Sequence, residues 1–194
     1  MLPSTENASH RHFLIHKPYG YLSQFVGEAK KKKLGEFHDF PAGIMAIGRL
    51  DEDSEGLLLL TTDGRMSEYI RSKKIEKEYS AQVDGLIDDE AIARMQAGVE
   101  IGIHNVRYQT NPCTAFRLDP APSFEPRTRK IRDDRHGPTS WVSITLTEGK
   151  FRQVRKMTAA VGFPTLRLVR VRVGALQLGE LISGAVLEVS GFEG

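Results

Sequence analysis

The sequence predicts an α+β fold, with a mixed, mostly antiparallel central sheet and flanking helices. Three observations predict it. Short segments rich in β-branched and aromatic residues recur along the chain, helical segments interrupt them at irregular intervals, and no regular strand–helix–strand repeat is present. The length of 194 residues, with 40% hydrophobic and 27% charged residues, is ordinary for a globular protein and sufficient for a buried core.

The predicted strands are short and differ in pattern. Four consecutive leucines within residues 57–62 indicate a strand that is covered on both faces. In residues 165–173, Arg167 alternates with Leu166 and Leu168, which is typical of a strand. The other segments expected to form strands are 13–16, 44–47, 77–83, 99–103, 105–108, 114–118 and 141–146.

Three helices are predicted between these strands. The first follows the turn Asp63-Gly64, the second begins after the capping residue Asp88, and the third runs from 149 to about 161. The apolar residues expected to share one face are Met66, Tyr69 and Ile70 in the first helix, Ile92 and Met95 in the second, and Val154, Met157 and Val161 in the third. The opposite face of the third helix is cationic, with Arg152, Arg155 and Lys156.

The chain is expected to form an N-terminal tail at 1–12 and a single domain at 13–194, with two lobes at about 13–85 and 86–194. Residues 119–139 are rich in proline and charge and lack periodicity, so they predict a long loop. No apolar run approaches the roughly 18 residues that span a bilayer, and the tail has no apolar signal region. A cytoplasmic protein is therefore expected. A monomer is also expected, because no heptad pattern is present.

The basic residues are clustered, although the net charge is only +2. Residues 149–172 contain seven basic residues and no acidic one. Two further clusters are Lys30–Lys33 and the set Arg127, Arg129, Lys130, Arg132 and Arg135. Such clusters suit a polyanion, because neutralised phosphates release their counterions. For the two loop clusters, a solvated surface is an equally good interpretation.

The loop at 48–56 carries several acidic residues and invites comparison with a calcium loop. Asp51, Asp53 and Glu55 match the spacing of ligands, but the twelfth position is Thr62 and the flanking segments are predicted strands. The six histidines are scattered and have no cysteine set at zinc spacing. We therefore expect no metal.

Nucleophilic residues give little support to hydrolase chemistry. Cys113 is the single cysteine and lies in a predicted β-rich stretch, where a cysteine is usually a small buried hydrophobe. Ser54 lacks the G-x-S-x-G pattern of a nucleophile elbow. What remains is a carboxylate, Asp51, on a loop beside Arg49.

The segment from Gly48 to Gly64, which reads GRLDEDSEGLLLLTTDG, resembles the signature of RNA pseudouridine synthases of the Rsu-type ribosomal branch. Three further blocks agree in order: His16-Lys17-Pro18-x-Gly20, Lys77-Glu78-Tyr79, and the segment from Glu148 to Met157 followed by Gly162, Leu168, Arg170 and Gly174. The resemblance spans nearly the whole chain. It implies a catalytic fold with a central cleft and isomerisation of a uridine without any cofactor.

The resemblance also implies roles for individual residues. Asp51 is implied as the catalytic carboxylate, and residue chemistry leaves open whether it attacks C1′, stabilises charge there or removes a ribose proton. Arg155 is implied as its ion-pair partner. Tyr79 would support the flipped base and Leu168 would close the opposite wall of the base site. The residues expected to contact phosphate or orient the loop are Lys17, Arg49, Arg152, Lys156 and Arg170.

The residues alone leave some of these roles open. A tyrosine in an alternating strand is more often a core aromatic, and Arg155 could equally be a phosphate-binding or solvated residue. The sequence departs from the family pattern at His16, where asparagine is usual. Because only about twelve residues precede Phe13, we also expect no separate N-terminal RNA-binding domain. Among branches without that domain, the blocks at 138–141 and 162–168 favour one that acts on large-subunit ribosomal RNA.

Two other functions remain as alternatives. A catalytically silent RNA-binding or ribosome-assembly factor would keep the fold and the basic face, but would have no use for a carboxylate that repels phosphate. A metal-dependent nuclease would use Asp51, Asp53 and Glu55 and would cleave the RNA chain. The sequence does not determine which uridine is modified.

Overall fold

The computed structural model describes residues 10–72, 75–131 and 134–192. Residues 1–9 of the expected tail and Arg132 of the third basic cluster lie outside these ranges. In the described residues, a nine-stranded sheet has a main path from β13 (Val186–Val189) through β1 (His12–Lys17), β5 (Glu55–Thr61), β11 (Thr165–Val173), β6 (Lys77–Asp84) and β10 (Thr139–Leu146) to β9 (Thr114–Arg117). Its remaining strands are β4 (Met45–Ile47), paired with β5, and β12 (Leu176–Gln177), paired with β11.

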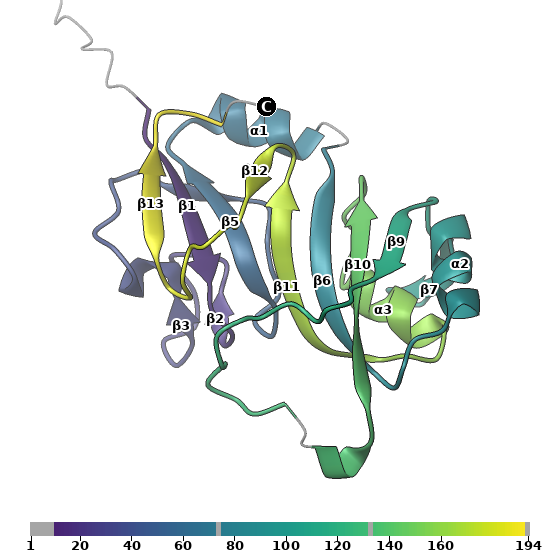
Figure 1. Cartoon of the computed structure of the whole chain (residues 1–194). Coiled ribbons are helices and arrows are strands. Elements are labelled where there is room, and N and C mark those ends of the chain that lie inside the picture. Colours follow the sequence, from purple (N-terminus) through teal and green to yellow (C-terminus); the bar gives the residue numbers. More distant parts are fainter. Residues whose placement is uncertain (1–9, 73–74, 132–133, 193–194) are drawn as a thin grey trace, which may run out of the picture.

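Two small sheets and three helices complete the described fold (Figure 1). The small sheets are the parallel pair β2 (Tyr21–Leu22) and β3 (Lys32–Lys33), and the antiparallel pair β7 (Glu100–Ile103) and β8 (Val106–Gln109). The helices are α1 (Gly64–Ser72), α2 (Asp89–Ala97) and α3 (Gln153–Ala160). Short 3-10 turns lie at Leu34–Glu36 and Asp134–His136. Figure 1 shows α2, α3 and β7 together at the β9–β10 end of the sheet.

The predicted fold class is confirmed. Within the described part of the main sheet, β5 and β11 run parallel and the other pairs run antiparallel. The division into lobes at residue 85 stays a prediction, although β11 lies between β5 and β6 and so joins both segments in one sheet. Among the described residues, no helix has the length and apolar character needed to cross a membrane.

The four leucines of β5 illustrate why this strand is central. All seven residues of β5 are buried, as the sequence predicts. Because successive side chains of a strand point to opposite faces, Leu57 and Leu59 pack into one core cluster and Leu58 and Leu60 into another. Both faces of the sheet are therefore covered at β5, and the loop before it is anchored to the most buried part of the fold.

The helix predictions are confirmed with local corrections. Asp88 caps α2, its Oδ1 accepting a hydrogen bond from the Ala91 amide at 2.8 Å. Helix α3 begins at Gln153 and not at 149, because Arg152 has a left-handed backbone with φ of 53°. The predicted buried face of α1 is only partly right, since the Tyr69 residue is 56% exposed. The strands β2, β3, β12 and β13 were not predicted, since they are short and lack a clear alternating pattern.

Candidate active site

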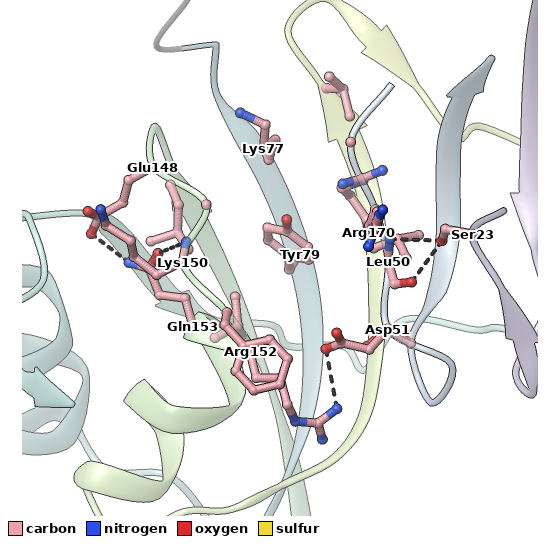
Figure 2. A pocket seen from close by; sticks show the side chains of 18 of the residues that line it. Ser23, Leu50, Asp51, Lys77, Tyr79, Glu148, Lys150, Arg152, Gln153 and Arg170 are labelled. Atoms are coloured by element: carbon pink, nitrogen blue, oxygen red, sulfur yellow. Dashed lines mark hydrogen bonds and ion pairs between the residues drawn. The ribbon is translucent and has the colours of Figure 1, made fainter. Parts of the chain in front are cut away.

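A cleft of about 860 Å³ opens across the strands β6 and β11. Figure 2 shows Glu148, Lys150 and Gln153 on one side, Leu50, Asp51 and Arg170 on the other, and Tyr79 between them. Six of the nine predicted site residues line this cleft: Arg49, Asp51, Tyr79, Arg152, Leu168 and Arg170. The structure thus brings together residues from three of the four sequence blocks.

The loop that carries Asp51 is held through its backbone. Ser23 forms two hydrogen bonds to Leu50: its hydroxyl donates to the Leu50 carbonyl at 2.7 Å and accepts from the Leu50 amide at 2.9 Å. The Gly20 amide donates to the Glu52 carbonyl at 2.7 Å. These bonds fix both neighbours of Asp51. Ser23 was not predicted, because no local pattern indicates a contact with a loop so distant in the chain.

Gly56 fixes the other end of the loop. It pairs with Arg170 where β5 and β11 run in parallel, and its φ is 107°. A Cβ atom at this position would overlap the backbone of Arg170. Glycine alone therefore permits β11 to approach this closely, and that approach places Arg170 and Leu168 in the cleft beside the loop.

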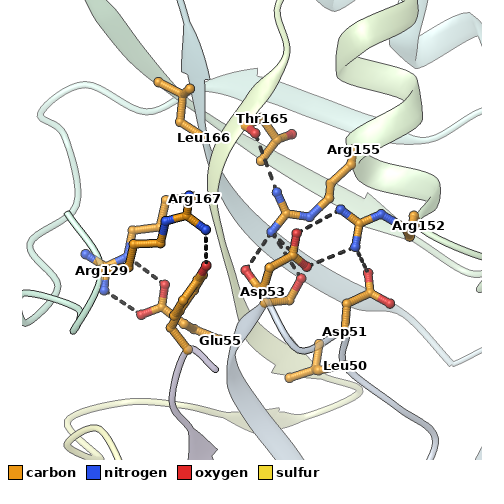
Figure 3. A network of polar contacts seen from close by, with 12 residues as sticks. Leu50, Asp51, Asp53, Glu55, Arg129, Arg152, Arg155, Thr165, Leu166 and Arg167 are labelled. Carbon is orange, nitrogen blue, oxygen red and sulfur yellow. Dashed lines mark hydrogen bonds and ion pairs between the residues drawn. The ribbon is translucent and has the colours of Figure 1, made fainter. Parts of the chain in front are cut away.

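Arg152 is the direct ion-pair partner of Asp51. Its Nη1 atom lies 3.3 Å from Asp51 Oδ2, and its guanidinium also donates to both oxygens of Asp53, at 2.9 and 2.8 Å (Figure 3). Burial pushes the pKa of Asp53 upward, but the Arg152 hydrogen bonds and the charge of Arg155 outweigh it and leave that pKa lowered. The Arg152 guanidinium thus forms ion pairs with the carboxylates of both Asp51 and Asp53.

The predicted ion pair between Arg155 and Asp51 is corrected by this arrangement. Arg155 donates through Nη2 to the Asp53 carbonyl at 2.7 Å and to the Ser54 hydroxyl at 3.3 Å, and it lies 3.5 Å from the Asp53 carboxylate. Its side chain is only 12% exposed and is not part of the cleft lining. Because Arg155 lies in the first turn of α3, it reaches beneath the loop and supports it (Figure 3).

Lys17 is a second correction. Lys17 was expected to contact phosphate or to orient the loop, and the phosphate contact is wrong because the residue is completely buried at the end of β1. Its Nζ donates to the Pro18 carbonyl at 3.0 Å and to the Tyr21 carbonyl at 2.7 Å. Burial lowers the pKa of Lys17 to about 8. The amine therefore organises the turn after β1 and is not available to RNA.

A third correction concerns Arg167 and Arg172 of β11, which the charge pattern counted among the cations facing a polyanion. Arg167 is buried and pairs with Glu55 at 2.7 Å, and Arg172 pairs with Glu76 at 2.9 Å and with Glu78 at 3.0 Å. Since β11 is a central strand, the protein itself covers these side chains and neutralises them. The count of basic residues in 149–172 therefore overstates the charge that faces a polyanion. Glu55, one of the three carboxylates of the nuclease alternative, is thus paired with Arg167.

Besides Lys150 and Arg152, four further cations line the cleft: Arg49, Arg71, Lys77 and Arg170. Arg170 donates through Nε to the Leu57 carbonyl at 2.8 Å, which fixes its side chain at the base of the cleft. Burial, followed by the nearby charge of Arg170, lowers the pKa of Lys77. Arg71 was not predicted, because nothing in the sequence of α1 indicates that it lies beside the cleft. Lys77 was also not predicted as a site residue, although it lies two residues before Tyr79 and therefore on the same face of β6.

Lys156 and Cys113 lie apart from the cleft lining. Lys156 donates to the Gly102 carbonyl at 2.6 Å, so the role in RNA binding expected for it stays a prediction. Burial raises the pKa of the Cys113 thiol to about 11. A thiol with that pKa is protonated at neutral pH, so Cys113 is a poor nucleophile, as expected.

Comparisons with known proteins agree on one family. A family model described as RNA pseudouridylate synthase matches residues 11–160. The chain is 43% identical to ribosomal large subunit pseudouridine synthase E of Xanthomonas axonopodis pv. citri (strain 306), covering 87% of this chain and 88% of the relative. It is 37% identical to the protein of the same name from Vibrio parahaemolyticus serotype O3:K6, covering 96% of this chain and 77% of the relative.

Solved structures share the fold. One described as a pseudouridylate synthase has a TM-score of 0.72 and 26% identity, covering 93% of this chain and 70% of the other. Human RNA pseudouridylate synthase domain containing 1 has a TM-score of 0.56 and 15% identity, covering 97% of this chain and 85% of the other. The second likeness concerns the fold alone.

Proposed function

Because the chain belongs to the RNA pseudouridylate synthase family, we propose that it isomerises a uridine of large-subunit ribosomal RNA to pseudouridine. The family predicted from the sequence blocks is confirmed. The choice of large-subunit RNA is supported by relatives named for that substrate, which align with most of this chain. That substrate is consistent with the expected cytoplasmic monomer, which also remains a proposal.

The observation that carries the proposal is the position of Asp51. Its carboxylate lies in a cleft of about 860 Å³, within the size range of sites that hold small molecules, so a nucleoside fits. In the isomerisation, the bond from C1′ to N1 breaks, the base turns, and a bond from C1′ to C5 forms. The proton on C5 leaves for solvent and N1 gains one. Asp51 attacks C1′, stabilises its positive charge or removes a ribose proton.

Arg152 supplies the charge that Asp51 needs when RNA fills the cleft. A carboxylate that loses its water tends to take up a proton unless a cation compensates. The 3.3 Å contact between Arg152 and Asp51 supplies this cation from the opposite wall. We infer that Arg152, supported by Arg155 beneath the loop, takes the part that the resemblance gave to Arg155 alone.

Tyr79 and Leu168 suit the reacting base. Tyr79 is half-buried between the two walls of the cleft, where its ring offers a surface for an extruded base (Figure 2). Leu168 is buried, is 5% exposed and also lines the cleft. Together they give the apolar surroundings that a flipped base requires.

The four cations Arg49, Arg71, Lys77 and Arg170 suit the phosphates on either side of the target nucleotide. Arg49 is exposed beside Asp51, whereas Arg170 is almost completely buried. A positive wall next to the Asp51 carboxylate attracts the RNA backbone while the acid still reaches the ribose. This arrangement favours an enzyme over a purely binding protein.

The test uses a transcript of large-subunit ribosomal RNA that carries tritium at C5 of uridine. The protein is expected to release the label in the presence of chelator and without cleaving the chain. Asp51→Asn and Asp51→Ala are expected to release none while still binding the transcript. Binding by the unmodified protein without any release would instead identify an RNA-binding factor, and chelator-sensitive cleavage would identify a nuclease. Pseudouridine mapping with and without the protein would then identify the uridine.

A further inference from the structure

An exposed aromatic surface adjoins the cleft. Phe151 lines the cleft yet is 54% exposed. The ring of His104 stacks on it, with centroids 5.6 Å apart and planes inclined by 20°. The ammonium group of Lys156 lies 5.0 Å from the centre of the Phe151 ring. We call these three residues the aromatic rim.

Two separate elements hold the aromatic rim in place. The left-handed backbone of Arg152 ends the loop just before α3, with Phe151 as its preceding residue. His104 and Asn105 form the two-residue turn between β7 and β8, both with positive φ, at 47° and 64°. Lys156 of α3 donates to the Gly102 carbonyl of β7, which joins the two elements. Figure 1 shows β7 and α3 at the same end of the sheet.

The chemistry of the aromatic rim suits a nucleotide. Phenylalanine and histidine rings stack on bases of any sequence, and a lysine beside them suits a phosphate. Lys150, exposed on the same wall of the cleft, lies 4.7 Å from the Tyr108 ring and adds a second cation over an aromatic residue. The nearby Glu148 is engaged by the Tyr108 hydroxyl at 2.6 Å and the Asn111 amide at 2.9 Å. The surface next to the cleft is thus aromatic and cationic.

We propose that the aromatic rim binds an unpaired nucleotide next to the target uridine, with its base on the Phe151–His104 pair and its phosphate at Lys156. The inference rests on the proposed function, because the target uridine defines which nucleotide is adjacent. RNA is favoured over a protein partner because the rim is continuous with the cleft, contains the cation Lys156 and adjoins the cation Lys150. The rim would then select targets in single-stranded or looped RNA.

The test compares variants of the full chain on the C5-labelled ribosomal transcript under single-turnover conditions. Loss of one base–aromatic stack is expected to raise the half-saturating protein concentration about 5- to 150-fold for Phe151→Ala. Phe151→Leu keeps an apolar side chain and is expected to show a similar loss, whereas Phe151→Trp retains the affinity. The maximal rate is expected to stay unchanged in all three variants. Phe116→Ala is the matched control, since Phe116 is 48% exposed on β9 outside the cleft lining.

The proposal would be overturned if Phe151→Leu and Phe151→Ala both kept the half-saturating concentration of the unmodified protein. A fall in the maximal rate with an unchanged half-saturating concentration would also overturn it. If Phe151→Ala proves unstable, the comparison of the leucine and tryptophan variants decides, because both are apolar and tryptophan alone keeps an aromatic ring that can stack. Failure of the proposed function is a separate result: the unmodified protein would then release no label. Filter binding of the same transcript would still report the contribution of Phe151 in that case.

Discussion

The carboxylate of Asp51 and the guanidinium of Arg152 lie 3.3 Å apart and come from opposite walls of the cleft (Figure 2). The backbone of Arg152 has a left-handed conformation, which residues other than glycine rarely adopt. Strained residues of this kind concentrate at functional sites. The start of α3 is therefore part of the site, and its conformation decides which arginine meets the catalytic loop.

The contribution of the Arg152 charge to the rate and the cost of its left-handed backbone conformation can be tested separately. Arg152→Ala and Arg152→Gly both remove the contacts to Asp51 and Asp53, and we expect each to lower the single-turnover rate at least about tenfold, which is ~1.4 kcal/mol. Glycine tolerates the left-handed conformation, so the glycine variant should be more stable than the alanine variant by about 1 kcal/mol in urea unfolding. A parent-like rate in Arg152→Gly would show that the ion pair is dispensable.

Ser23 should affect the rate through the position of Asp51. Ser23→Ala leaves the buried amide and carbonyl of Leu50 without their partner, which is expected to lower the free energy of unfolding by ~1–3 kcal/mol. The maximal rate of label release should fall because the loop is no longer fixed, while the half-saturating concentration stays unchanged. Ser23→Thr keeps the hydroxyl and should recover part of the rate. An effect on saturation alone would argue for direct contact with RNA.

Arg49 and Arg167 should separate RNA binding from stability. Arg49 is exposed in the cleft, so Arg49→Ala should weaken binding and reduce the slope of affinity against salt by about 1. Arg167→Ala leaves the charge of Glu55 buried, with its side chain only 2% exposed, and should destabilise the fold by ~3–5 kcal/mol. Urea unfolding and filter binding over a range of salt would check both. If Arg167→Ala weakened RNA binding and left the free energy of unfolding unchanged, Arg167 would instead face RNA.

Lys17 should make stability depend on pH. Burial lowers its pKa from 10.5 to about 8, so between these values the unfolded chain holds a proton that the folded chain has lost. Unfolding then takes up a proton, and rising pH favours the folded state. The cost of burying the charged amine, ~3 kcal/mol, is fully present below about pH 8 and disappears as pH approaches 10.5.

The variant Lys17→Met has no titrating amine at position 17 and is therefore the control for the free energy of unfolding. From pH 7.5 to pH 10, we expect the free energy of unfolding of the parent to rise relative to that of Lys17→Met. Urea unfolding at several pH values measures the difference, and other titrating groups cancel because both proteins carry them. A constant difference across this range would show that the amine of Lys17 keeps its ordinary pKa in the folded protein.

Local patterns predicted most of the elements. The leucine run gave β5, Asp88 gave the start of α2, and Val154 and Met157 gave the buried face of α3. These features depend on neighbours a few residues away, so the sequence carries them directly. The blocks around Asp51 and Tyr79 likewise predicted the family, and the structure places both residues in one cleft.

The environments of the charged residues depended on distant segments. Lys17, Arg155 and Arg167 resemble surface cations in sequence, yet strands and loops far along the chain bury or engage each of them. Ser23 gained its role from a contact with Leu50 that no local spacing encodes.

The sequence by itself thus determined the longer strands and the helices, the family and the candidate role of the carboxylate at position 51. Only the tertiary structure decided that Arg152 pairs with that carboxylate and which cations remain free to meet RNA. The reason is physical: secondary structure follows from local periodicity, whereas the burial and the partner of a charge follow from what the folded chain brings beside it.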